Sequence, residues 1–183
     1  MKIIGYVGAE GGPLLIIDAE LAYRWGGIDT DDYDRVCALF DENELAEGIE
    51  IEIGDVNGLL WELNGPGVAY IIDDGVGLRL VRAWLNEGVD ELAAVLKFAE
   101  IERRQDSALI GRVVVSSKKL AVIWATENGD AIQSALGLGV DRNNKKTSID
   151  DSSIVIGVKK SFYTASCDIV SNEYGRARRL FLV

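Results

Sequence analysis

Residues 48–54 (GIEIEIG) alternate isoleucine with glutamate between two glycines. Successive side chains of a β-strand point to opposite faces, so this spacing places the isoleucines on one face and the glutamates on the other. A strand with one buried and one solvated face is typical of antiparallel sheets. The stretch therefore predicts an antiparallel sheet in the first half of the chain.

The segments that follow extend this sheet. Asn57-Gly58 predicts a tight hairpin turn into a strand at 59–63 (LLWEL), because Asn-Gly favours two-residue hairpin loops. A break at 64–67 (NGPG) precedes two more strands, at 68–73 (VAYIID) and 78–84 (LRLVRAW). With the first strand, these segments predict a four-stranded antiparallel meander.

The chain before this sheet predicts two short buried strands, at 2–7 (KIIGYV) and 12–17 (GPLLII). Asp18 is placed to cap the short helix that follows. We expect Trp25 to lie in the core, and Gly26 to end the helix in the left-handed conformation that glycine adopts readily.

Two longer amphipathic helices are expected. In residues 31–40 (DDYDRVCALF), the spacing i, i+3, i+4, i+7 predicts a buried stripe. That stripe consists of Tyr33, Val36, Cys37 and Phe40. A second helix is expected at 89–104, with its first turn favoured by acidic residues. Its inner stripe is predicted to consist of Val89, Leu92, Leu96 and Ala99.

The second half of the chain is mostly β. Five strands are predicted, at 109–117, 119–126, 153–158, 162–170 and 178–183. Residues 137–153 form a polar loop, with 141–146 (DRNNKK) as its tip. These elements predict one α+β unit over residues 1–183, in which a reversal of charge near Asp106 separates two candidate lobes. The first (1–106) is acidic and α+β, and the second (107–183) is β-rich.

The charge is strongly uneven. The chain carries a net charge of −11, with −15 on residues 1–106 and +4 on residues 107–183. Twelve acids lie between Asp29 and Glu62, with only Arg35 to offset them. Such a field repels nucleic acid and attracts basic partners, although a solvated acidic face that keeps the protein soluble is the simpler alternative.

Several kinds of chemistry are excluded by composition. The chain contains no histidine, which removes Ser-His-Asp and Cys-His arrangements and the usual zinc sites. No glycine-rich stretch has phosphate-loop spacing, and residues 29–34 (DTDDYD) lack the glycine of a calcium loop. We therefore expect no cofactor and no metal. Catalysis by a pair of carboxylates stays open, and Arg176, Arg178 and Arg179 either contact phosphate or form a solvated face.

Cellular location follows from two further observations. Apolar runs fall far short of the roughly 20 residues that cross a bilayer, so no membrane association is expected. Cys37 and Cys167 lack the spacing of a disulfide framework, and we expect both to be buried thiols of a reducing compartment. The protein is therefore predicted to be cytoplasmic.

A short motif in the first 40 residues carries a family resemblance. It reads GGPLL, then WG, then DYDR-V-C, and its members are Gly11, Gly12, Pro13, Leu14, Leu15, Trp25, Gly26, Asp32, Tyr33, Asp34, Arg35 and Cys37. In this order the motif resembles the start of immunity protein 21, a family of bacterial polymorphic-toxin systems. The resemblance implies a non-enzymatic protein that binds and neutralises a cognate protein toxin in the cytosol of the producing cell.

The acidic segment is the predicted contact surface for such a toxin, which we expect to be basic where it binds. The predicted toxin-binding residues are Asp29, Asp31, Asp32, Asp34, Asp41, Glu42, Glu44, Glu47, Glu50 and Glu52. Asp34 and Arg35 are expected to form a structural ion pair. Two alternatives stay open: a small cytosolic enzyme that uses a carboxylate pair, and a non-catalytic scaffold subunit.

Overall fold

Two antiparallel sheets of six strands each form the centre of the computed structural model, which describes residues 1–44, 46–137 and 146–183. In order across the sheet, sheet A consists of β1 (Lys2–Ala9), β5 (Gly67–Asp73), β6 (Leu78–Leu85), β12 (Gly175–Leu182), β11 (Phe162–Asn172) and β7 (Ala108–Val114). Sheet B consists of β3 (Gly48–Ile53), β4 (Val56–Glu62), β2 (Pro13–Asp18), β8 (Lys119–Trp124), β10 (Ser153–Gly157) and β9 (Lys146–Asp150). The α+β class predicted from the sequence is confirmed.

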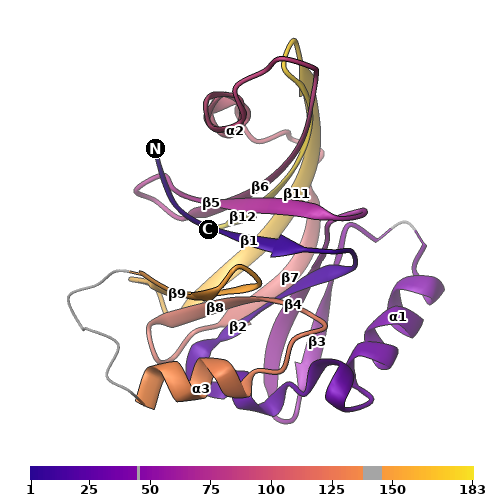
Figure 1. The fold of residues 1–183 in the computed structure, drawn as a ribbon, viewed down its shortest axis with the longest axis vertical. Helices are drawn as coiled ribbons and strands as arrows, with labels where there is room; N and C mark the ends of the chain where they lie inside the picture. Colours follow the sequence, from indigo (N-terminus) through magenta and orange to yellow (C-terminus); the bar gives the residue numbers. More distant parts are fainter. Residues whose placement is uncertain (45, 138–145) are drawn as a thin grey trace.

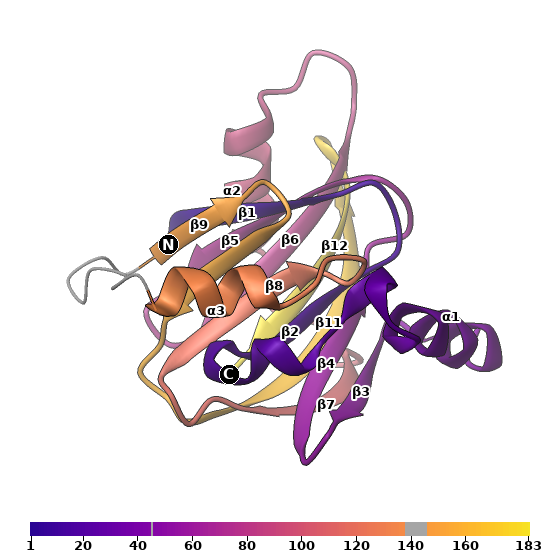
Figure 2. The ribbon, with the colours of Figure 1, turned by 60° about the horizontal axis from the view of Figure 1, so that its bottom comes forward.

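Helical segments cover the outer faces of both sheets (Figures 1 and 2). They are the 3₁₀ turns η1 (Ala19–Arg24) and η2 (Gly27–Asp29), and the helices α1 (Asp32–Glu42), α2 (Glu91–Glu100) and α3 (Asp130–Gly137). The largest apolar cluster lies between the sheets. A second cluster joins sheet B to η1, α1 and α3, and a third joins sheet A to α2. Apolar residues on both faces of each sheet therefore hold the four layers together.

The β3–β4 hairpin confirms the alternation that opens the sheet but corrects its turn. Ile51 and Ile53 are buried, and Glu50 and Glu52 are exposed. Ile53 pairs with Val56, so the two-residue loop is Gly54-Asp55, and the predicted turn at Asn57-Gly58 is wrong. Gly54 takes the positive φ of 67° that such a loop requires. Gly58 instead lies within β4, where the side chains of Leu15 and Ile53 crowd the space above it.

The predicted four-stranded meander is also wrong. β4 pairs with β2 rather than with β5, and the break at 64–67 carries the chain from sheet B to sheet A. Asn64 and Gly65 both have positive φ there, which lets the chain change direction sharply. The first two strands likewise enter different sheets. Each sheet takes strands from both sides of residue 106, so the change of charge along the chain does not separate one sheet from the other.

Trp25 is fully buried, as predicted, and its indole Nε1 donates to the carbonyl oxygen of Ala125 (3.0 Å). Asp18 caps η1 by accepting from the amide of Glu20 (3.0 Å), which confirms the predicted cap. The predicted left-handed conformation of Gly26 is wrong, because Gly26 is right-handed and Gly27 has the positive φ of 57°.

Cys37 is exposed on α1, so the prediction of a buried thiol is wrong there. α1 packs against sheet B along a line that contains Val36 and Phe40, and a residue one step further round the helix turns away from it. Cys167 is buried as predicted, and burial raises the pKa of its thiol to about 12.

α2 is shorter than the predicted helix at 89–104, and its buried stripe differs from the predicted one. Leu92 is 53% exposed, whereas Val95 and Phe98 are fully buried against sheet A. Of the predicted stripe, Ala99 is fully buried. Several apolar residues follow one another in this helix, and the sequence pattern therefore allowed more than one packed face.

The five strands predicted for the second half of the chain are present as β7, β8, β10, β11 and β12. The predicted loop at 137–153 is wrong in part, because it contains β9 and the start of β10. Most of its predicted tip, 141–146, lies outside the described residues. Of the described helices, none is long and apolar enough to span a membrane.

Candidate functional site

α1 carries an unpaired acidic surface. Figures 1 and 2 show this helix at the margin of the molecule, beside the β3–β4 end of sheet B. Five exposed acids lie on it or directly beside it, and we call them the α1 acidic surface: Asp31, Asp34, Asp41, Glu42 and Glu44. Their carboxylates make no hydrogen bond or ion pair with the described part of the chain. All five were predicted as binding residues, and the structure brings them together.

The carboxylate of Asp32 is used inside the protein instead. It accepts from the amide of Gly26 (2.9 Å), from the hydroxyl of Thr30 (3.1 Å) and from Arg35 Nη2 (3.1 Å). These bonds tie the start of α1 to the chain that follows η1. Arg35 pairs with Asp32, so the predicted ion pair between Asp34 and Arg35 is wrong.

Glu50 also has structural partners. Its two carboxylate oxygens accept from the amide of Arg112 (2.7 Å) and from Asn57 Nδ2 (2.6 Å). Since Arg112 belongs to β7, this side chain joins the edge of sheet B to the edge of sheet A. Glu52, two residues further along β3, is exposed and has no bonded partner in the described residues.

Two further predicted residues are partly engaged. Glu47 pairs with Arg178 Nε at 2.8 Å, and its side chain is 27% exposed. Asp29 is exposed and accepts from Asn128 Nδ2 (3.1 Å). The ten predicted residues therefore divide into the α1 acidic surface with Glu52, and four carboxylates that have partners within the protein.

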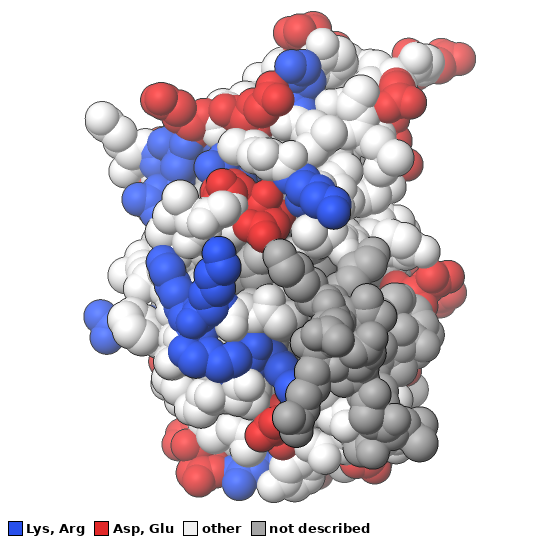
Figure 3. Space-filling model, turned by 90° about the vertical axis from the view of Figure 1, so that its left-hand side faces the viewer, with Lys and Arg blue, Asp and Glu red and all other residues white. Residues whose placement is uncertain are grey.

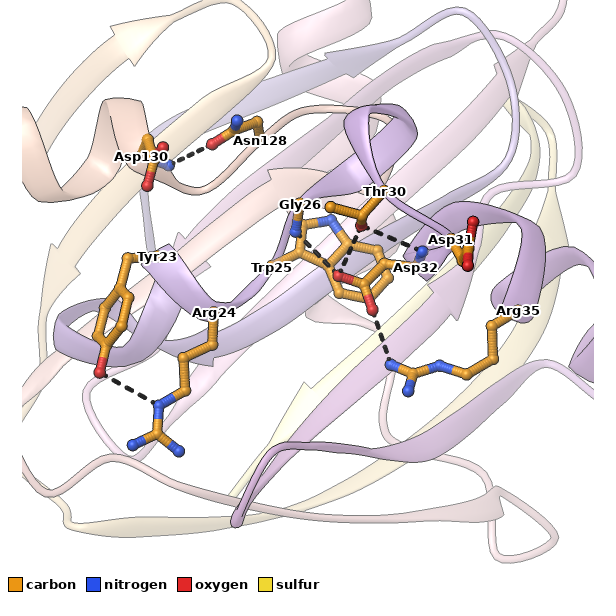
Figure 4. Close-up of a pocket in the computed structure, with 10 residues that line it drawn as sticks. All are labelled: Tyr23, Arg24, Trp25, Gly26, Thr30, Asp31, Asp32, Arg35, Asn128 and Asp130. Carbon is orange, nitrogen blue, oxygen red and sulfur yellow. Dashed lines mark hydrogen bonds and ion pairs between the residues drawn. The ribbon is translucent and has the colours of Figure 1, made fainter.

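A polar pocket of about 540 Å³ lies next to the α1 acidic surface (Figure 4). Its lining comes from η1, the residues on either side of η2, the start of α1 and the start of α3: Tyr23, Arg24, Trp25, Gly26, Thr30, Asp31, Asp32, Arg35, Asn128 and Asp130. Figure 4 shows Arg24 and Arg35 on opposite sides of this pocket, with Asp32 directed to Arg35. Arg24 is paired with Asp55. Both guanidinium groups are thus balanced, whereas Asp31 and Asp130 have no such partner in the described residues.

Sequence reasoning did not identify the contribution of η1 and α3 to this pocket. Tyr23 is 48% exposed, and Ile28 on the neighbouring η2 is 67% exposed. Asp130 begins α3, a helix that the sequence analysis did not predict. The signal was present in the apolar spacing of Ile132 and Leu136, which pack against the outer face of sheet B.

The far side of the molecule has a different charge. Figure 3 shows the face at the left of Figure 1, where Lys and Arg gather near the centre and Asp and Glu lie mainly around them. Lys118, Lys159 and Lys160 are exposed in two neighbouring turns, and Lys118 Nζ donates to the carbonyl oxygen of Lys159 (3.1 Å). The acids of α1 therefore belong to one side of the molecule.

The pKa values of two carboxyl groups are lowered by their hydrogen-bond partners. A hydrogen bond from Arg104 holds the pKa of the Asp106 carboxyl below its ordinary value. Burial opposes ionisation of Asp74, but hydrogen bonds from the Gly77 amide and from Arg79 outweigh it and lower the pKa. A general acid needs the opposite shift. Within the described residues, no group of three or more metal-ligating side chains is placed to hold a metal ion.

Comparisons with protein-family models, with curated proteins and with solved structures found no match for this chain. The resemblance to immunity protein 21 therefore stays a prediction that rests on the motif within residues 11–37. The structure gives that motif a structural role. Gly12 leaves room for the hydroxyl of Tyr33, Trp25 fills the core, and the carbonyl oxygen of Gly11 accepts from Trp124 Nε1 (2.6 Å).

Proposed function

We propose that this protein is an immunity protein, which binds a basic surface of a cognate toxin and inhibits it by occlusion. The α1 acidic surface is the observation that carries this proposal. Five unpaired carboxylates within fourteen residues create a local negative field, which accelerates encounter with a partner of opposite charge. An inhibitor that must reach a toxin before the toxin acts benefits from fast association.

The positions of two of these acids, Asp41 and Glu42, support a role other than stability. Asp41 and Glu42 lie in the last turn of the helix, which has no basic residue. The carboxyl end of a helix carries partial negative charge, so an acid there costs roughly 0.3–1 kcal/mol. The sequence keeps both acids where folding disfavours them, as expected for residues retained for binding.

The surroundings of α1 supply the rest of an interface. A specific complex buries on the order of 1,600 Å² in total, which is more than one short helix can provide. Tyr23 and Ile28 are large exposed side chains beside the pocket, and apolar or aromatic anchors usually dominate the binding energy. We assign them as anchors, with the acids of α1 at the rim and the pocket open to a cationic side chain of the toxin.

Protection from the toxin tests this function. The chain is co-expressed with the toxin encoded next to it in its genome, and cell survival is measured. The α1 variant, which carries Asp31→Asn, Asp41→Asn, Glu42→Gln and Glu44→Gln, should protect less well than wild type.

A matched variant controls for net charge. The α2 variant replaces four exposed acids on and beside α2 by glutamine: Glu87, Glu100, Glu102 and Glu173. It changes the net charge equally and should protect as well as wild type. Equal protection by both variants would remove the α1 acidic surface from the interface. Absence of a neighbouring toxin gene, with metabolic genes in its place, would instead favour the carboxylate enzyme or the scaffold subunit.

A further inference from the structure

The face of sheet A that packs on sheet B continues beyond the core between the sheets. In Figure 1, β6, β11 and β12 extend past sheet B toward α2. Leu180 and Leu182 of β12 lie in that core. Alternate residues of a strand share a face, so Arg178 and Arg176 follow on the same side, toward the start of β12.

Register brings these two arginines next to an aromatic and an aliphatic residue. Arg176 is paired with Trp84 of β6, and Arg178 is paired with Ile169 of β11. Together with Asn64, from the segment between the sheets, they enclose a hollow of about 250 Å³. Its lining thus consists of two guanidinium groups, one amide, one indole and one aliphatic side chain.

The buried arginine of this hollow is held firmly and keeps donors to spare. Arg178 is only 8% exposed. Its Nη1 donates to the carbonyl oxygen of Glu62 (2.7 Å), and its Nε lies 2.8 Å from the Glu47 carboxylate, as an ion pair without hydrogen-bond geometry. Its Nη2 has no partner in the described residues. Because burial and the Nη1 hydrogen bond restrict the guanidinium, Nη2 is oriented before any ligand arrives.

The other donors of the hollow are also available. Arg176 is exposed, and its guanidinium makes no bond within the described part of the chain. The indole Nε1 of Trp84 likewise has no protein acceptor among those residues. Behind it, the guanidinium carbon of Arg82 lies 4.9 Å from the ring centroid of Trp84, which adds a further positive charge near the hollow.

We propose that this hollow binds an oxyanion, a phosphate or carboxylate group of a small ligand. No acid lines the hollow, and the neighbouring Glu47 is already paired with Arg178. Arginine forks match the two oxygens of such groups. The volume is below the roughly 300–1,000 Å³ of pockets that hold whole drug-sized ligands, which fits a single phosphate or carboxylate group. The site is independent of the toxin interface proposed above.

The hollow also explains where two of the three arginines at 176–179 lie. Arg176 and Arg178 face the hollow, whereas Arg179 points to the opposite face and is fully buried beside Asp168. The expectation of a solvated face is wrong for Arg178 and Arg179. The chain has a net charge of −11, so its overall field repels anions. Binding of an oxyanion to this chain would therefore depend on the local positive charge of Arg176 and Arg178.

Titration with two probes tests the site. Inorganic phosphate and succinate are added separately to the full chain at constant ionic strength, and binding is measured by calorimetry. Wild type should bind at least one probe, and the stronger probe identifies the class of oxyanion. Arg176→Gln should weaken that binding at least tenfold, because Arg176 is a free donor of the hollow.

Two controls separate a site from general charge. Arg112→Gln removes an exposed cation on β7, away from the hollow, and should leave the binding constant within twofold of wild type. Trp84→Phe removes the indole donor and should weaken binding severalfold. Circular dichroism of each variant should match that of wild type. Failure of wild type to bind either probe, or equal weakening by Arg176→Gln and Arg112→Gln, would overturn the proposal.

Discussion

α1 and α2 are helices of similar length on outer faces of the same molecule. The acids on the two helices differ in how many have a partner within the protein. Asp90 caps α2 by accepting from the amide of Ala93 (2.8 Å), and Lys97 pairs with Glu100 (2.9 Å). On α1, Asp32 pairs with Arg35, but Asp34, Asp41 and Glu42 have no partner in the described residues. Unpaired carboxylates on α1 are what the proposed role of this helix in binding a partner requires.

A side chain of sheet A bonds the carbonyl oxygens at the carboxyl end of α2. Arg179 is fully buried and donates to the carbonyl oxygens of Phe98 (2.9 Å), Ile101 (2.7 Å) and Glu102 (3.1 Å). The same guanidinium pairs with Asp168 through two bonds, of 2.8 and 2.7 Å. One cation thus satisfies the last carbonyls of the helix and a buried carboxylate, which is the arrangement that α1 lacks.

Removing that cation gives the largest expected loss. Arg179→Met should lower the free energy of unfolding by about 5 kcal/mol, the upper end of the range for breaking a buried ion pair, because three carbonyls also lose their donor. Chemical denaturation measures the loss. Arg176→Gln on the same strand should change it by less than about 0.5 kcal/mol. A loss near 1 kcal/mol for Arg179→Met would show that Asp168 finds other partners.

Near α1, the main stabilising side chain is apolar, the buried Trp25. Trp25→Ala should lower the free energy of unfolding by about 4 kcal/mol, within the usual range for deletion of a buried aromatic side chain. The change leaves a cavity under η1 and removes the donor to Ala125. Thermal melting provides the measurement, and an unchanged midpoint would mean that Trp25 is exposed in solution.

Local patterns were enough to predict most strands, because an apolar run or an alternation over five to eight residues indicates a strand. The alternation at 48–53 and the β-rich second half were both correct. Partners between strands were not predictable in the same way. The break at 64–67 can close a hairpin or cross between sheets, and the choice depends on the pairing of β4 with β2, which lies far away in the sequence.

The candidate site was likewise predictable only in part. Charge density along the sequence located the α1 acidic surface, but it could not distinguish Asp31 from Asp32, which are neighbours with different roles. The carboxylate of Asp32 is held by Gly26 and Thr30, and that geometry exists only in the folded chain. The pocket beside α1 depends on Asn128 and Asp130, about a hundred residues away from η1 in the sequence.

Association kinetics would sharpen the assigned role of α1. At low salt, the α1 variant should associate with the toxin about tenfold more slowly than wild type, since steering by opposite charge acts mainly on the on-rate. Its on-rate should also depend less on salt. The α2 variant should keep the wild-type rate and the wild-type salt slope. Surface plasmon resonance at two salt concentrations gives both quantities, and identical slopes for the α1 variant and wild type would place the interface elsewhere.

The smallest expected effect tests the comparison of the two helices most directly. Glu42 lies in the last turn of α1, where a negative charge opposes the helix dipole, and Glu91 lies in the first turn of α2, where it is favourable. Glu42→Gln should therefore raise the free energy of unfolding by about 0.3–0.5 kcal/mol, and Glu91→Gln should lower it by at least as much, because Glu91 also bonds the Tyr70 hydroxyl.

Paired urea denaturation curves at low salt resolve differences of this size when both variants are measured beside wild type. Added salt should reduce both effects, since the two glutamates are exposed. For affinity to the toxin the ranking should differ. Glu42→Gln should bind more weakly than wild type, and Glu91→Gln should bind as wild type does. A variant that gains stability and loses affinity is the expected behaviour of a residue retained for binding, whereas a loss of stability in Glu42→Gln would mean that this acid supports α1.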